Sequence, residues 1–187
     1  MKWMLGPVLG TLLLAGAAAA DSASPYAGWQ TRDIKALSAQ QIDDLRAGRG
    51  LSLALAAELN GYPGARHVLD LGGELRLTAA QRAAFEDLFR AMQAEAQQLG
   101  SEILTEEAAL DEAFRSGRAD EAALRDHLAR LGALQADLRY AHLRSHLAAR
   151  TLLSPTQVAQ YNALRGYAPG AGAGTAHGGH GHIPAQP

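Results

Sequence analysis

The most constraining feature of this sequence is an unbroken helical pattern that runs from residue 79 to about residue 115. Apolar side chains recur along it every 11 residues, which is a period of about 3.67 residues per turn and suits a nearly straight helix. The stripe that this period forms consists of Phe85, Leu88, Met92, Ala96, Leu99, Ile103, Leu110 and Phe114. A stripe this long has to be buried against a second long element.

A second apolar stripe lies on a predicted helix over residues 121–151, where it is made by Leu124, Leu128, Leu131, Leu134 and Leu138. The break between the two runs suits a tight turn, because Gly117 can adopt a left-handed conformation and Asp120 can cap the next helix. The sequence therefore predicts a long antiparallel helical hairpin. Aromatic residues make up only 5% of the chain and β-branched residues are sparse, which excludes an all-β fold and favours an all-α one.

Short helices are predicted on either side of the hairpin. Three capping boxes, in which Ser or Thr is followed three residues later by Gln, begin at Ser38, Thr78 and Ser154. The short helices that we expect cover residues 39–46, 51–59, 65–75 and a last segment starting at Pro155. The apolar 51–59 segment should form a buried turn or two of helix, and the last helix should bury Val158, Tyr161 and Leu164.

The two ends of the chain differ from its helical part. Residues 1–20 combine a positive start at Lys2, an apolar stretch and an Ala-Ala-Ala cleavage site, which is the pattern of a secretory signal peptide. Only if this segment were retained would it serve as a membrane anchor. We expect a flexible lead-in over 21–37, a helical domain over 38–166 and a disordered tail of Gly, Ala and His over 167–187.

Several classes of function find no support in the sequence. The 17 Lys and Arg residues against 19 Asp and Glu give no basic excess for nucleic acid. There is no cysteine, so any metal has to be bound by His, carboxylate or Met. No phosphate-binding loop, G-x-S-x-G or H-E-x-x-H motif is present, and we expect no enzyme. The acids Glu102, Glu106 and Glu107 are expected on the outer, solvated face of their helix.

Two of the capping boxes have the form Leu-(Ser/Thr)-x-x-Gln, over Leu77–Gln81 and Leu153–Gln157, and they bracket the predicted hairpin. In a chain with a signal peptide, this pattern resembles the Spy and CpxP family of periplasmic stress proteins, including its ZraP-like and CnrX-like heavy-metal relatives. The resemblance covers about residues 65–165. It implies a hooked, all-α hairpin that forms a homodimer in the periplasm. It also implies either metal sensing or ATP-independent chaperone activity.

His142 and His146 are the first candidate metal ligands. On a helical projection they fall at the angles of Leu124 and Leu128, so both should face the interior. Imidazoles four residues apart on a helix can bind one ion. The resemblance also places metal ligands four apart on this helix in CnrX-like relatives. The alternative is a pair of partly buried histidines that hydrogen-bond to the backbone or to carboxylates.

His67 is the candidate third ligand, because its segment should lie at the end of the hairpin that carries both boxes. Asp70 and Glu74 follow it and could act as ligands or as hydrogen-bond acceptors for a ligand. The alternative for His67 is a capping or surface histidine. His127 lies near the tip of the hairpin, more than three turns from His142, and should not share this site.

Three more histidines, His177, His180 and His182, lie in the tail. They could bind Zn, Ni or Cu weakly, because imidazole suits all three ions, or they could belong to a plain solvated end. The function that we expect is a periplasmic stress protein that binds a divalent transition metal. The alternatives are a metal-independent chaperone for unfolded clients and an inhibitory partner of an envelope sensor.

The chaperone alternative depends on the surface of the two long helices. Leu143 and Leu147 make the second helix apolar on two sides near its end, where a second chain or a client could bind. Arginines are spread over both helices, at positions 82, 90, 115, 118, 125, 139, 144 and 150. Arg suits a client-binding cradle because it packs its stem and binds carboxylates, but the same residues would decorate any solvated hairpin.

Overall fold

The computed structural model describes residues 24–168, and within this range all regular structure is helical. The elements in chain order are η1 (Trp29–Thr31), α1 (Ala39–Arg46), α2 (Leu55–Glu58), α3 (Ala65–Asp70), α4 (Ala79–Arg115), α5 (Glu121–Leu152) and α6 (Pro155–Leu164). The predicted all-α fold is confirmed for this part of the chain. The expected signal peptide and almost all of the expected tail lie outside the described residues. No helix within 24–168 is long and apolar enough to cross a membrane.

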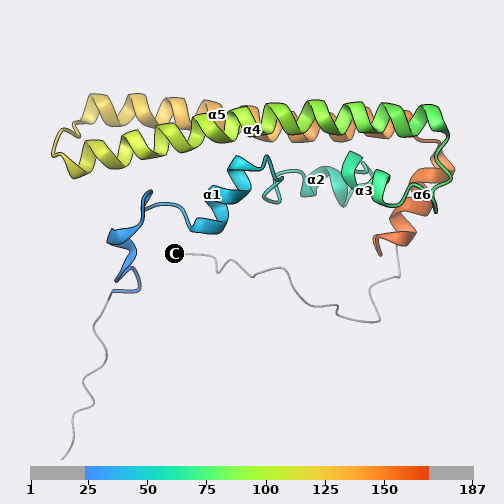
Figure 1. Ribbon diagram of the computed structural model, residues 1–187, viewed down its shortest axis with the longest axis horizontal. Helices are drawn as coiled ribbons and strands as arrows, with labels where there is room; N and C mark the ends of the chain where they lie inside the picture. The colour runs from blue at the N-terminus through green and yellow to red at the C-terminus, as the bar shows by residue number, and fades with distance from the viewer. Residues whose placement is uncertain (1–23, 169–187) are drawn as a thin grey trace, which may run out of the picture.

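Helices α4 and α5 form the predicted antiparallel hairpin (Figure 1). At its tip Gly117 has a φ of 69°, a conformation that favours glycine, and the Asp120 side chain accepts a hydrogen bond from the Ala123 amide at 2.8 Å. Helices α1 to α3 lie along one side of the hairpin, and α6 turns back from its open end. The result is a hook: α4 and α5 form its long shaft, and α3 and α6 form its bend at the open end of the hairpin.

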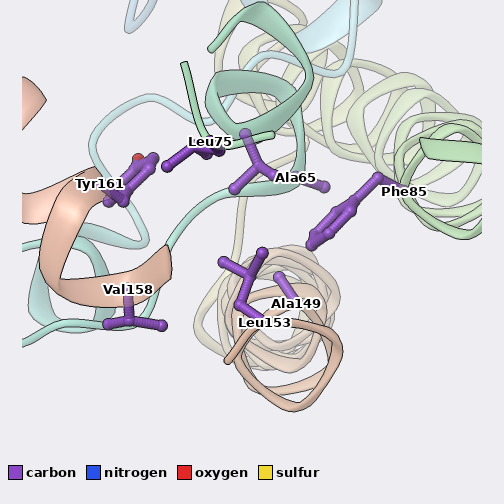
Figure 2. Packing of buried hydrophobic residues seen from close by; sticks show 8 residues of the cluster. Ala65, Leu75, Phe85, Ala149, Leu153, Val158 and Tyr161 are labelled. Carbon is purple, nitrogen blue, oxygen red and sulfur yellow. The ribbon is translucent and has the colours of Figure 1, made fainter. Parts of the chain in front are cut away.

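Two apolar clusters hold the short helices to the hairpin. The first lies in the hook, where Val68 of α3, Tyr161 of α6 and Phe85 of α4 belong to one cluster and are fully buried. Figure 2 shows Ala65 and Leu75 between Tyr161 and Phe85. The second joins α1 to the middle of the shaft, and its buried members are Ile34, Leu45, Ala96, Ile103, Leu104, Leu131 and Leu138. Ile34 is 8% exposed, so the end of the segment that we expected as a flexible lead-in is packed against the shaft.

The glutamines of the two Leu-(Ser/Thr)-x-x-Gln boxes close the hook. Thr78 and Ser154 form the capping boxes that the sequence predicts. Beyond capping, Gln81 Nε2 donates to the Leu152 carbonyl at 2.8 Å and to Gln157 Oε1 at 3.0 Å. Gln157 Nε2 donates to the Leu75 carbonyl at 3.1 Å. Each glutamine therefore satisfies a backbone carbonyl of a neighbouring segment, and the two glutamine side chains hydrogen-bond to each other.

Several details of the sequence prediction were wrong. The 51–59 segment has one turn of helix, as expected, but its burial was wrong: Leu55 and Leu59 are 47% and 56% exposed, and the buried residue of α2 is Glu58. Helix α3 ends at Asp70, where the Gly72-Gly73 pair disfavours continuation. Leu164 is exposed because it lies beyond the packed turn of α6. Phe114 and Leu128, both toward the hairpin tip, are also exposed.

The packing of α1 against α4 depends on Gly100. A Cβ atom at this position would lie 2.2 Å from the Leu45 carbonyl oxygen, whereas a Cβ at Gly132 of α5 would have nothing within 4 Å. We expect Gly100→Ala to lower the free energy of unfolding by about 1–3 kcal/mol, because α1 has to move. Gly132→Ala should raise it by about 1 kcal/mol through helix propensity. Urea denaturation of both variants measures the two shifts, and a stabilised Gly100→Ala would contradict this packing.

Candidate metal centre

The three histidines that the sequence singled out line one cavity. His67 comes from α3, and His142 and His146 come from successive turns of α5. The cavity has a volume of about 560 Å³ and lies between α3, the segment after α1 and the shaft. Its other lining residues are Ala47, Gly48, Arg49, Gly50, Gly64, Ala65, Arg66, Phe89, Met92 and Gln93. The structure therefore brings the predicted ligands to a common space.

His142 is the most buried of the three, with 5% of its surface exposed, as its place on the apolar arc predicts. Burial lowers its pKa below the usual value, and the neighbouring His146 adds to this effect, so the ring is neutral at pH 7. Its Nε2 atom is buried and has no hydrogen-bond partner among residues 24–168. The alternative, in which hydrogen bonds to the protein satisfy the His142 ring, therefore does not hold for Nε2.

His146 is held by the backbone. Its Nδ1 atom lies 2.7 Å from the Tyr62 carbonyl oxygen, and a carbonyl can only accept, so Nδ1 donates. In the neutral ring the lone pair then lies on Nε2. An imidazole oriented through its other nitrogen by a carbonyl is the usual arrangement of a metal-binding histidine.

His67 is held in the same way by a carboxylate. Its Nδ1 atom lies 3.3 Å from Oε1 of Glu58, and the Tyr161 hydroxyl is 3.4 Å from the same nitrogen. The His67 side chain is 42% exposed, so it can turn without disturbing the core. As with His146, donation through Nδ1 leaves Nε2 free to bind an ion.

Glu58 is the central residue that the sequence prediction missed. It is 5% exposed, accepts hydrogen bonds from the Tyr161 hydroxyl and from the Gly64 amide at 3.1 Å, and lies 3.6 Å from Arg165 Nε. Burial alone would raise its pKa, but the hydrogen bonds from His67 and Tyr161 outweigh burial and hold it at about 2. The carboxylate is therefore ionised, and burial beside it raises the pKa of Tyr161.

A signal for Glu58 exists in the sequence, because it is the only charged residue between Gly50 and Pro63. The acids that were proposed instead do not serve this role. Asp70 forms an ion pair with Arg66 at 3.0 Å, and Glu74 is exposed. The carboxylate that orients His67 thus comes from α2, before α3, and not from the turns that follow it.

The cavity is not a finished ligand shell. Within residues 24–168 no group of three or more His, Asp or Glu side chains is already placed to hold a metal ion. His127 lies elsewhere, paired with Glu106 and Arg130, as its distance along the helix predicts. The tail histidines His177, His180 and His182 lie outside the described residues.

The fold and site define a class of protein: an all-helical hook closed by two glutamine boxes, with a histidine-lined cavity beneath the shaft. The model of the LTXXQ motif family matches residues 64–165, so the chain belongs to this Spy/CpxP-like family, whose members are periplasmic. The resemblance inferred from the two boxes is thereby confirmed. No curated protein and no solved structure matches the chain.

Proposed function

We propose that this protein is a periplasmic stress protein that binds one divalent transition metal ion, Zn²⁺, Ni²⁺ or Cu²⁺, through His142, His146 and His67. The observation that carries the proposal is the common cavity in which these three imidazoles lie. Each has a ring nitrogen without a hydrogen-bond partner among the described residues, and imidazole nitrogen suits all three ions. Met92 adds a soft thioether to the same wall.

The residues present fit such an ion. The buried, orphaned Nε2 of His142 would gain the partner that a buried polar atom requires. Tyr62 and Glu58 already hold the other two rings through Nδ1, which fixes their tautomers. Within residues 24–168 the three rings are not yet placed as one shell, so assembly requires a shift of the exposed His67 ring toward the pair on α5 that keeps its Nδ1 contact with Glu58. Ligands from α3 and α5 would then tie the hook to the shaft, which links metal supply to the stability of the fold.

Titration of the purified protein with Zn²⁺, Ni²⁺ and Cu²⁺, followed by calorimetry, tests the proposal. The comparison variant carries His177→Ala, His180→Ala and His182→Ala, so that the tail contributes no ligand. We expect the variant to keep one saturable site per chain and to unfold at a higher temperature when metal is added. If the variant binds no ion while the unaltered chain does, the metal belongs to the tail and the cavity proposal fails.

A metal-independent chaperone is the second candidate, and exposed apolar side chains favour it. Large side chains of this kind that are more than half exposed include Leu59, Phe114, Leu128, Tyr140 and Leu147. Such residues can hold the apolar segments of an unfolded client. The protein should then suppress aggregation of an unfolded client with EDTA present and without ATP. Failure to do so at a molar excess of the protein would rule out this candidate.

A further inference from the structure

A second cavity lies farther along the shaft and shares no lining residue with the histidine cavity. It has a volume of about 210 Å³, lies between α1, the segment after it, α4 and α5, and is open to solvent on one side. Six of its lining residues are aliphatic: Leu37, Leu45, Leu51, Leu53, Ile103 and Leu138. Apolar cavities of about 150 Å³ accept benzene, so this one has room for a single ring with a short substituent.

Glu107 lines this apolar cavity together with Gln41 and Gln135. The expectation that Glu106 and Glu107 face solvent was wrong for both, because Glu106 pairs with His127 and Arg130 of α5 and Glu107 is covered from the α1 side. Among residues 24–168 no side chain or backbone group forms a hydrogen bond or ion pair with the Glu107 carboxylate. Burial raises its pKa.

Partial burial without a partner in residues 24–168 sets Glu107 apart from the other acids of α4, since Glu86 is exposed. Glu95 is paired with Arg144, Asp111 with Lys35 and Glu112 with Arg115. A carboxylate that is half withdrawn from water without compensation disfavours the folded state. A ligand that brings a positive charge to this position would remove that cost.

The wall of the cavity next to α1 is built by an unusual backbone. Leu51 and Ser52 have φ angles of 43° and 63°, a left-handed conformation that a leucine rarely adopts. This conformation costs on the order of 1 kcal/mol or more per residue. Leu51 and Leu53 both line the cavity, so this left-handed turn forms part of its wall.

We propose that this cavity binds a small organic cation, a primary amine on an apolar body about the size of one aromatic ring. The ammonium group pairs with the Glu107 carboxylate, and the apolar body lies among the six aliphatic side chains. Gln135 supplies an amide oxygen as a further acceptor at the rim. The site is independent of the histidine cavity and does not require metal.

Calorimetric titration of the full chain with phenethylamine, in the presence of EDTA, tests this site. The neutral analogue 2-phenylethanol has the same ring and spacer without the charge. We expect saturable binding of phenethylamine, with 2-phenylethanol at least about tenfold weaker, because the ion pair is lost. Glu107→Gln should weaken phenethylamine by about the same factor and leave 2-phenylethanol unchanged.

Glu102→Gln is the matched control, because Glu102 lies on the same helix, is exposed and does not line the cavity. It should leave the Kd for phenethylamine unchanged. Absence of saturable binding overturns the proposal, as does equal affinity for the amine and the alcohol. An equal loss of phenethylamine affinity in Glu102→Gln and Glu107→Gln would show that the amine is attracted to the acidic helix as a whole, which would also overturn the proposal.

Discussion

Glu58→Gln is expected to lower the free energy of unfolding by about 3 kcal/mol at neutral pH. The carboxylate is 5% exposed, and its pKa is held at about 2 instead of 4.5. Each unit of that shift corresponds to about 1.4 kcal/mol in favour of the folded, ionised form. Glutamine has nearly the same shape, but its NH₂ group would face donors that now point at a carboxylate.

Those donors explain why the loss should be large. Tyr161 of α6, the Gly64 amide before α3 and Arg165 after α6 all point at this one side chain. Tyr161 contacts one carboxylate oxygen and Gly64 the other, and glutamine keeps only one oxygen, so one of these buried donors is left facing an NH₂ group and Arg165 loses its countercharge. Urea denaturation should show a lower midpoint with an unchanged slope. Glu74→Gln is the control, an exposed acid in the turn after α3, and equal stability of the two variants would contradict a central role for Glu58.

The same carboxylate predicts acid sensitivity. Because the pKa of Glu58 is lower in the folded protein than its ordinary value, protonation favours the unfolded chain. The stabilisation is therefore complete above about pH 5 and is lost as the pH falls toward 2. Unfolding free energies measured across this range should fall by about 3 kcal/mol more in the unaltered protein than in Glu58→Gln. Parallel curves for the two proteins would show that Glu58 does not contribute.

The hairpin could be predicted because the signals for it are local. Helical periodicity, the turn at Gly117 and the caps at Thr78, Asp120 and Ser154 each act within a few residues. The apolar stripe on α5 likewise predicted that His142 faces the interior. The expected position of His67 near the open end of the hairpin predicted that it lies close to His142, and both line the same cavity. These inferences require only that two long helices pair and that their boxes meet.

The roles of Glu58 and Glu107 could not be predicted, because they depend on which short element covers which face. The apolar composition of 51–59 predicts burial, yet α2 exposes Leu55 and Leu59 and buries its only acid. Charge patterning along α4 predicted Glu107 on the outer face of that helix. Glu107 becomes part of a cavity only because α1 and the strained turn at Leu51 pack over it. Neither position follows from periodicity.

His142→Ala is expected to weaken metal binding on the order of 100-fold or more in the tail-substituted variant, because one of three ligands is lost. The fold should tolerate the change, because alanine removes an imidazole whose buried Nε2 has no partner in the described part of the chain, which offsets part of the packing lost. Circular dichroism should therefore show unchanged helicity. His127→Ala is the control, since His127 pairs with Glu106 near the hairpin tip, and it should leave the metal affinity unchanged.

Glu58→Gln separates a ligand from a residue that orients one. Glu58 contacts Nδ1 of His67 and does not line the cavity, so we expect it to orient the His67 ring and not to bind the ion itself. Loss of such a partner weakens metal binding about 10- to 100-fold without abolishing the site. We therefore expect full stoichiometry with a weaker Kd in Glu58→Gln, and loss of the stoichiometric site in His142→Ala. If His142→Ala binds as tightly as the parent, the cavity histidines are structural and the metal proposal fails, whatever Glu58→Gln does to stability.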